Sequence, residues 1–290
     1  MIYRLGILPW FTCNVTCSYC FYKSCSLTGY LSPFSLSHAL DSVKHELAPE
    51  VTIHFTGGEP LIDTPQLRRY IEIVRATVKI ASVVISSNGT VDITRSFDIL
   101  QQEVPIVFVI TIDTLGQSSW RSASGRPLVG ARILDSIPNE RPYGVAVVTP
   151  VLPDLTCQDY IDLVQYANKK GIWSFELNLV KGLQYDDIDA VAMKLQEILV
   201  YCANIPGVQL HGDWLAFLRE GSARCKRIVR HDNDSAVLFP DGSLRFCELD
   251  VGHVPQLERQ PESCPFAHAQ MAVICETIRH QQHVKMAPRV

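Results

Sequence analysis

The sequence predicts an α/β fold in which an open, partial (β/α)6 barrel of the TIM-like kind is followed by a small cysteine-containing C-terminal extension. From residue 2 to about residue 202, short β-branched runs alternate with amphipathic helical stretches, which is typical of a parallel sheet. Six such units are too few to close an eight-stranded barrel, so we expect an open sheet with its site at the carboxyl ends of the strands. The alternation stops after residues 205–207, which predicts two regions, 1–204 and 205–290.

The predicted strands are short runs rich in Val and Ile, at Ile2–Leu8, Val51–Phe55, Ala81–Ser86, Ile106–Ile112, Tyr143–Val148 and Trp173–Val180. Three helices are indicated by apolar stripes with helical spacing, at Leu36–Leu47, Pro65–Val78 and around Asp187–Cys202. Thr64 is expected to cap the second helix, because Pro65 suits a first helical turn. In the second region, Ala236–Phe239 and Ser243–Cys247 are expected to pair as a hairpin.

The amino-acid composition limits the kinds of molecule that the protein is expected to bind. The net charge is −4, and no run of five or more like charges occurs, so the electrostatic footprint of a nucleic-acid or membrane partner is missing. The first ten residues are too short and too weakly apolar for a signal peptide or a membrane span, and we expect a cytoplasmic protein. Ten cysteines in that compartment indicate metal ligation or redox chemistry, because disulfides are rare there.

Three cysteines form a compact motif directly after the first predicted strand. Cys13, Cys17 and Cys20 have the spacing CxxxCxxC. Three thiolates on one loop can each ligate a different iron of a [4Fe–4S] cubane, which leaves the fourth iron without a protein ligand and open to a substrate. The alternatives are a zinc site, which normally needs four ligands, and a coincidence of structural cysteines.

This motif resembles the signature of the radical S-adenosylmethionine (SAM) superfamily, and Tyr19 matches the aromatic residue that usually precedes the last cysteine. The resemblance implies that the amino and carboxylate groups of SAM chelate the open iron, with the aromatic ring near the adenine. It also implies that the stretch Gly57, Gly58, Glu59 and Pro60 holds the amino group of SAM. Two glycines permit close backbone approach and a glutamate accepts hydrogen bonds from an ammonium, although such a stretch alone can be a tight turn.

Polar residues after the third and fourth strands extend the resemblance. Ser86 and Asn88 offer hydroxyl and amide groups to the ribose or carboxylate of SAM, although Ser-Asn-Gly is also an ordinary turn sequence. Thr111 and Asp113 project to the same side of a strand by its period of two, and the family places such residues at the ribose hydroxyls. Arg121 lies where related enzymes often carry an arginine and is therefore a candidate SAM contact, although the sequence favours a solvated loop arginine.

The second region contains four cysteines and resembles the SPASM/twitch extension, whose hairpin lies between two cluster-binding cysteines. Residues 239–247 match that hairpin, which implies an auxiliary Fe–S cluster with the ligands Cys225, Cys247, Cys264 and Cys275. Structural cysteines are the alternative. Among the remaining cysteines, Cys157 and Cys202 are expected to be small buried hydrophobes, and Cys25 on the cluster loop is a candidate hydrogen-atom donor to a substrate radical.

The function implied by the resemblance is reductive cleavage of SAM by an electron from a flavodoxin- or ferredoxin-type reductant, which gives methionine and a 5′-deoxyadenosyl radical. That radical would abstract hydrogen from a ribosomal peptide, leading to epimerisation or to a thioether or carbon–carbon crosslink. A dozen residues precede Cys13, so we expect no N-terminal leader-binding domain. The alternative is dehydrogenation or rearrangement of a small alcohol, sugar or natural-product intermediate. A non-catalytic Fe–S carrier is disfavoured, because the polar strand ends would then have no ligand.

Overall fold

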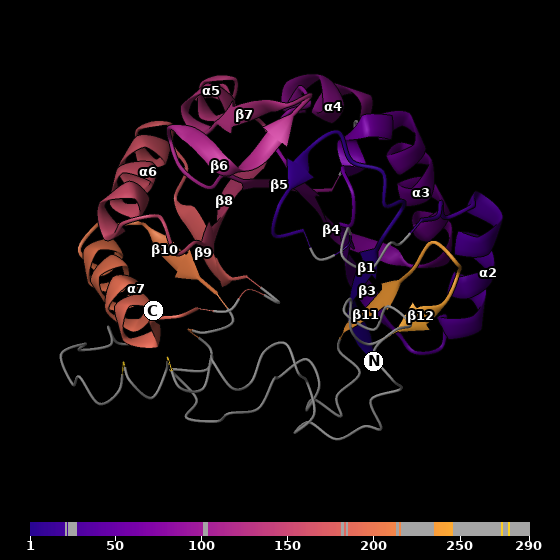
Figure 1. Ribbon diagram of the computed structural model, residues 1–290. Coiled ribbons are helices and arrows are strands. Elements are labelled where there is room, and N and C mark those ends of the chain that lie inside the picture. Colours follow the sequence, from indigo (N-terminus) through magenta and orange to yellow (C-terminus); the bar gives the residue numbers. More distant parts are fainter. Residues whose placement is uncertain are drawn as a thin grey trace.

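The computed structural model describes residues 1–20, 22, 28–100, 104–180, 183, 185–212, 215, 235–245, 274 and 278. Its main element is one open sheet of nine strands in the order β10-β9-β8-β5-β4-β3-β1-β11-β12, in which every neighbouring pair is parallel except β11 and β12. The strands follow an arc, and the helices lie along its outer side (Figure 1). The predicted open α/β barrel is thereby confirmed.

All six predicted strands are present at the centre of the sheet, as β1 (Ile2–Ile7), β3 (Leu47–Phe55), β4 (Lys79–Ser87), β5 (Ile106–Thr111), β8 (Gly144–Val151) and β9 (Ser174–Leu179). The helices are α2 (Pro33–Val43), α3 (Thr64–Thr77), α4 (Ile93–Leu100), α5 (Gly130–Asp135), α6 (Cys157–Lys169) and α7 (Ile188–Ala203), with a 3-10 turn η1 (Pro60–Asp63) before α3. Within the described residues, no helix is long and apolar enough to span a membrane.

Three helix boundaries differ from the sequence prediction, two of them because of their N-caps. Helix α2 starts earlier, since the Ser32 side chain accepts a hydrogen bond from the Ser35 amide and Pro33 opens the first turn. The helix also ends before Leu47, which is already the first residue of β3. At α3 the N-cap is Asp63 rather than Thr64, because the Asp63 carboxylate accepts from the Gln66 amide.

The sheet continues beyond the six predicted units. Strand β10 (Gln209–His211) pairs with β9 at one edge, and β11 (Ser235–Leu238) pairs with β1 at the other. Strand β12 (Leu244–Arg245) completes the predicted hairpin, whose turn is closed by a hydrogen bond from the Phe239 amide to the Ser243 carbonyl. Parts of the region after residue 204 are therefore strands of the main sheet, and a separate extension over 205–290 stays a prediction.

The strands present two different faces. On β3, Val51, Ile53 and Phe55 are buried against the helices, whereas Thr52 and His54 between them are only partly buried. The same alternation continues on β4 and β9, where the partly buried positions include Ser82, Ser86, Glu176 and Asn178. Parallel strands in α/β proteins are usually apolar on both faces. The corresponding positions on β5 and β8 are mostly apolar, so the polar groups of this partly accessible face are concentrated on β3, β4 and β9.

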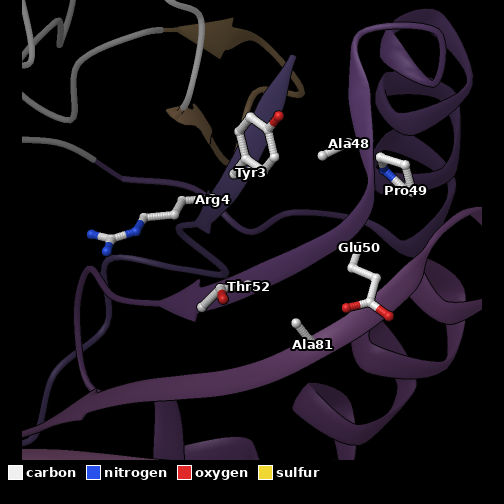
Figure 2. Close-up of a pocket in the computed structure, with 7 residues that line it drawn as sticks. All are labelled: Tyr3, Arg4, Ala48, Pro49, Glu50, Thr52 and Ala81. Atoms are coloured by element: carbon white, nitrogen blue, oxygen red, sulfur yellow. The ribbon is translucent and has the colours of Figure 1, made fainter.

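A pocket of about 420 Å³ lies at the opposite end of the sheet from the cysteine loop. Its walls are the first residues of β1, β3 and β4, among them Tyr3, Arg4 and Ala81 (Figure 2). The cysteine loop instead follows the carboxyl end of β1. This pocket is therefore separate from the site that the strand ends form.

Candidate active site

The cysteine loop is held by a second, smaller sheet. Strand β2 (Thr16–Cys17) pairs antiparallel with β6 (Gln117–Ala123), which pairs with β7 (Arg126–Val129). Cys17 lies opposite Arg121, and the Ser18 amide donates to the Trp120 carbonyl at 2.9 Å. A segment about 100 residues away in the chain thus fixes the backbone of the loop.

The three motif cysteines are free thiols on this loop. Cys13 is exposed, and Cys17 and Cys20 are half-buried. Within the described residues, no three His, Cys, Asp or Glu side chains converge as they would around a single metal ion. Three thiolates on one short loop can each ligate a different iron of a cubane.

Hydrogen bonds to sulfur also fit an iron–sulfur centre. The Val15 amide lies 3.4 Å from Cys13 Sγ, and Asn88 Nδ2 lies 3.7 Å from the same sulfur. Such bonds are one of the means by which proteins adjust cluster potentials. Burial raises the pKa of Cys17 to about 11, and the neighbouring Arg121 guanidinium partly offsets this effect. The residues present therefore fit a [4Fe–4S] cluster.

The two glycines of the Gly-Gly-Glu-Pro stretch lie against the backbone of the cysteine loop. The Gly58 amide donates to the Trp10 carbonyl at 3.0 Å, and the Glu59 amide donates to the Thr12 carbonyl at 2.9 Å. A Cβ atom at Gly58 would lie 2.1 Å from the Thr12 carbonyl oxygen, so only glycine fits. Close approach to another protein segment is thus one reason for glycine here.

Glu59 is fully buried, and its carboxylate joins the ends of two strands. Oε1 accepts from the Leu61 amide and from Ser87 Oγ, both at 3.0 Å, and Oε2 accepts from the Asn88 amide at 2.7 Å. Burial raises the pKa of Glu59, and these three hydrogen bonds offset part of the rise. The carboxylate thus has protein donors around it and acts as a positioning group, while a direct contact with the SAM ammonium stays a prediction.

Asp113 is the centre of a second buried network. Its Oδ1 accepts from Tyr19 Oη at 2.8 Å and lies 3.6 Å from Arg121 Nη1, while its Oδ2 accepts from Ser118 Oγ. Burial raises the pKa of Tyr19, and the Asp113 carboxylate raises it further, so the phenol stays protonated as a donor. Asp113 is 4 % exposed, and its predicted contact with the SAM ribose is not tested by these contacts.

Arg121 is buried rather than solvated, which overturns the alternative of a loop arginine. It is 3 % exposed, its Nη1 donates to the Thr111 carbonyl at 2.5 Å, and its Nη2 donates to the Asn88 carbonyl at 2.9 Å. Three of the predicted SAM-binding residues are therefore joined behind the cysteine loop, where Arg121 contacts both Asn88 and Thr111.

Two of the predicted residues lie on the partly accessible face. Ser86 Oγ is 2.8 Å from His54 Nε2, which joins β3 to β4 across the inner face, and Thr111 is partly buried at the end of β5. Sequence reasoning missed His54, although its alternation with Ile53 and Phe55 places it on the polar face. It also missed the serine donors, Ser87 and Ser118, for which the sequence carries no distinct signal.

Several predicted residues lie outside the described residues, namely Cys25, Cys225, Cys247, Cys264 and Cys275. Of the two remaining cysteines, Cys202 is buried and Cys157 is half-buried. Burial is the main cause that raises the pKa of each thiol to about 12. These values suit the inert, hydrophobe-like role predicted for them.

Comparison with known proteins agrees with this geometry. The family model described as the radical SAM superfamily matches residues 7–195. Streptococcus suis SuiB bound to S-adenosylmethionine is 15% identical with a TM-score of 0.66, and the alignment covers 88% of this chain and 62% of SuiB. Native anSMEcpe with bound AdoMet is 16% identical with a TM-score of 0.66, and the alignment covers 99% of this chain and 84% of that chain.

These structural matches establish the fold alone, because the identities are low, and the chain spans less than two thirds of the length of SuiB. No curated protein matches the chain in sequence. The family model covers well over half of the 290 residues and includes the cysteine motif, the Gly-Gly-Glu-Pro stretch and both buried networks. This chain belongs to the radical SAM superfamily.

Proposed function

We propose that this radical SAM enzyme abstracts hydrogen from a ribosomally made peptide, which it epimerises or crosslinks through a thioether or carbon–carbon bond. The observation that carries the proposal is the position of the cysteine loop, at the carboxyl end of β1 and beside a concave sheet face with polar side chains. When bound, the cluster and SAM supply a 5′-deoxyadenosyl radical, which can attack unactivated carbon. The tasks of the protein are then to bind and orient SAM and the substrate and to exclude water from the site.

The roles of the chain's own residues follow from their contacts. Cys13, Cys17 and Cys20 would hold the cluster, with β6 fixing their loop. Gly57 and Gly58 bring backbone groups next to that loop, where carbonyl oxygens could accept from an ammonium. Pro60 starts the turn that leads into α3. Further contacts proposed for SAM are those of Tyr19, Glu59, Ser86, Asn88, Thr111, Asp113 and Arg121.

A peptide substrate suits the inner face of the sheet. Hydroxyl, imidazole, carboxylate and amide groups there can pair with peptide N–H and C=O groups, and they come from Thr52, His54, Ser82, Ser86, Glu176 and Asn178. SuiB bound to its precursor peptide SuiA is similar in structure to this chain, with 13% identity and a TM-score of 0.66. A second similar structure is that of anSMEcpe with bound AdoMet and the Cp18Cys peptide.

We also propose an auxiliary Fe–S cluster in a SPASM/twitch-like tail and a flavodoxin- or ferredoxin-type reductant in the cytoplasm. The β11–β12 hairpin supports the tail, because it forms where the sequence resemblance requires one. Alanine substitution of Cys13, Cys17 and Cys20 together should leave about four irons per chain on the tail cysteines, against about eight in the parent. A triple variant without iron would remove the auxiliary cluster from the proposal.

The substrate class is tested by following one hydrogen atom. Short peptides encoded beside the gene are synthesised with deuterium at each α and β carbon and incubated anaerobically with the reconstituted enzyme, SAM and a low-potential reductant. We expect deuterium in 5′-deoxyadenosine and a peptide whose mass or stereochemistry has changed. Deuterium transfer only from a small alcohol or sugar, and from none of the peptides, would favour the alternative small-molecule reaction.

A further inference from the structure

Arg121 is a buried cation that lies directly opposite one of the proposed cluster ligands. It pairs with Cys17 across β2 and β6, where its positive charge acts to lower the pKa of the Cys17 thiol against the rise caused by burial. Its Nε is buried without a hydrogen-bond partner among the described residues. A buried donor without an acceptor is uncommon in native proteins and calls for an explanation.

The guanidinium is fixed in this position. Nη1 and Nη2 donate to the carbonyls of Thr111 and Asn88, at the ends of two neighbouring strands. The planar guanidinium therefore cannot turn toward solvent without breaking both bonds. The two hydrogen bonds thus hold its charge on the side of β6 that faces Cys17.

Asp113 is the counter-charge, and it is fixed as firmly. Its Oδ1 lies 3.6 Å from Arg121 Nη1, and the hydroxyls of Tyr19 and Ser118 saturate the rest of the carboxylate. Both members face the cluster loop: Arg121 lies opposite the proposed ligand Cys17, whereas Asp113 meets the loop through the hydroxyl of Tyr19. The surroundings are poorly screened by solvent, because both side chains are almost completely buried.

We infer that Arg121 sets the reduction potential of the cluster on Cys13, Cys17 and Cys20, with Asp113 limiting its effect. The inference rests on the proposed cluster ligands. Reduction adds one electron from a low-potential donor and converts [4Fe–4S]²⁺ to [4Fe–4S]⁺ with no transfer of atoms. A fixed positive charge stabilises the more negative reduced state and so raises the potential, while a nearby carboxylate lowers it.

Two substitutions that each remove one charge test this by the sign of their effects. Arg121→Gln replaces the cation by a shorter, neutral amide, and Asp113→Asn replaces the carboxylate by an isosteric neutral amide. Arg126→Gln is the matched control, because it removes the same charge from an exposed position on β7 of the same small sheet. Each protein carries the Cys225→Ala and Cys247→Ala background, so that only the cluster on β2 is observed.

The midpoint potential is measured without SAM, by a redox titration followed by electron paramagnetic resonance of the reduced cluster, alongside iron and sulfide content. We expect a lower potential in Arg121→Gln, a higher potential in Asp113→Asn, and the parent value in Arg126→Gln. Shifts of Arg121→Gln and Asp113→Asn in the same direction, or no shift, would overturn the inference. If Arg121→Gln holds no cluster, the Asp113→Asn result decides, and a potential at or below the parent value overturns it.

Iron content separates this inference from the assignment on which it rests. A parent protein without iron would remove the cluster on Cys13, Cys17 and Cys20 and the inference together. A parent with about four irons and variants with the parent potential would remove the inference alone.

Discussion

Two buried carboxylates lie behind the cysteine loop, and they differ in what surrounds them. Within the part of the chain that the structure describes, Glu59 accepts from three neutral donors, two of which are backbone amides, whereas Asp113 lies beside a buried arginine and accepts from two hydroxyls. Glu59 therefore fixes the course of the chain where β3 and β4 end. The Asp113 network holds the charge of Arg121 beside Cys17.

The difference teaches that burial alone does not define the role of a carboxylate in this site. A carboxylate that accepts hydrogen bonds from amides fixes the conformation of a loop. When it is removed, a water molecule can accept hydrogen bonds from the same amides and compensate for part of the loss. A carboxylate paired with a buried cation balances charge, and loss of either partner leaves the other uncompensated. The two networks should therefore respond differently to substitution, in both size and additivity.

The largest effect on stability is expected at Arg121. Arg121→Met should lower the free energy of unfolding by about 3–5 kcal/mol, because Asp113 is then a buried charge without a partner. Adding Asp113→Asn should recover part of the loss, so that the double variant is more stable than the sum of the single effects. Chemical unfolding of the cluster-free chain followed by circular dichroism measures both quantities. Strictly additive effects would contradict a charge-balanced pair.

A smaller effect is expected at Glu59. Glu59→Ala should cost about 1–3 kcal/mol, since it removes an acceptor from three donors but leaves space for water. No single substitution among its neutral partners should restore the loss, in contrast to the Arg121 and Asp113 pair. If the Glu59→Ala, Ser87→Ala double variant were more stable than Glu59→Ala alone, the Glu59 network would behave like the Asp113 network, and the proposed difference between them would be contradicted.

The pH dependence of stability provides a third comparison. Burial raises the pKa of Glu59 above its ordinary value near 4.5, so the folded chain binds more protons than the unfolded chain between those two values. The contribution of Glu59 is therefore greatest below pH 4.5 and declines as the pH rises through the folded-state pKa. The stability of the parent relative to Glu59→Gln should fall with rising pH by at most about 1.4 kcal/mol per pH unit. A difference that stays constant or grows with pH would contradict the raised pKa.

The smallest effects are expected at the two serines that donate to these carboxylates. Ser87 Oγ bonds Glu59 and the Gly89 amide, whereas Ser118 Oγ bonds Asp113 and the amides of Trp120 and Arg121. Each substitution should cost about 0.5–1.5 kcal/mol, because water can replace part of a lost hydroxyl, and Ser118→Ala should lie at the upper end because its hydroxyl makes more bonds. Thermal unfolding of the two variants under the same conditions shows which of them is less stable. A larger loss of stability in Ser87→Ala would show that the Ser118 hydroxyl does not stabilise the Asp113 network.

The central strands and the cysteine motif could be predicted from the sequence because both are local patterns. Runs such as Val51–Phe55 are short and β-branched, and the cysteine spacing lies within eight residues. The small sheet could not be predicted in this way, because Gln117–Ala123 is polar and does not alternate like a half-buried strand. Its one local signal is the Ser124–Gly125 turn, where both residues have positive φ, as in the tight turns of hairpins.

The hydrogen-bond and ion-pair partners of the functional side chains were the feature that the sequence predicted least well. The Gly-Gly-Glu-Pro stretch indicated a carboxylate for a ligand, but two of the three donors to Glu59 come from the end of β4 and the residue after it, 28 and 29 residues further along the chain. A solvated loop was expected for Arg121, because its buried surroundings exist only once the ends of β4 and β5 meet β2. Such contacts depend on tertiary packing, which local propensity does not encode.

The central claim is that the cysteine loop supports reductive cleavage of SAM. The most direct measurement is the amount of 5′-deoxyadenosine formed when the reconstituted protein is incubated anaerobically with SAM and dithionite. We compare the parent with Cys17→Ala, using Cys202→Ala as a control because Cys202 is buried on α7, outside the loop. Production of 5′-deoxyadenosine by the parent and Cys202→Ala, and none by Cys17→Ala, is the expected result. Formation at the parental rate by Cys17→Ala would contradict the account.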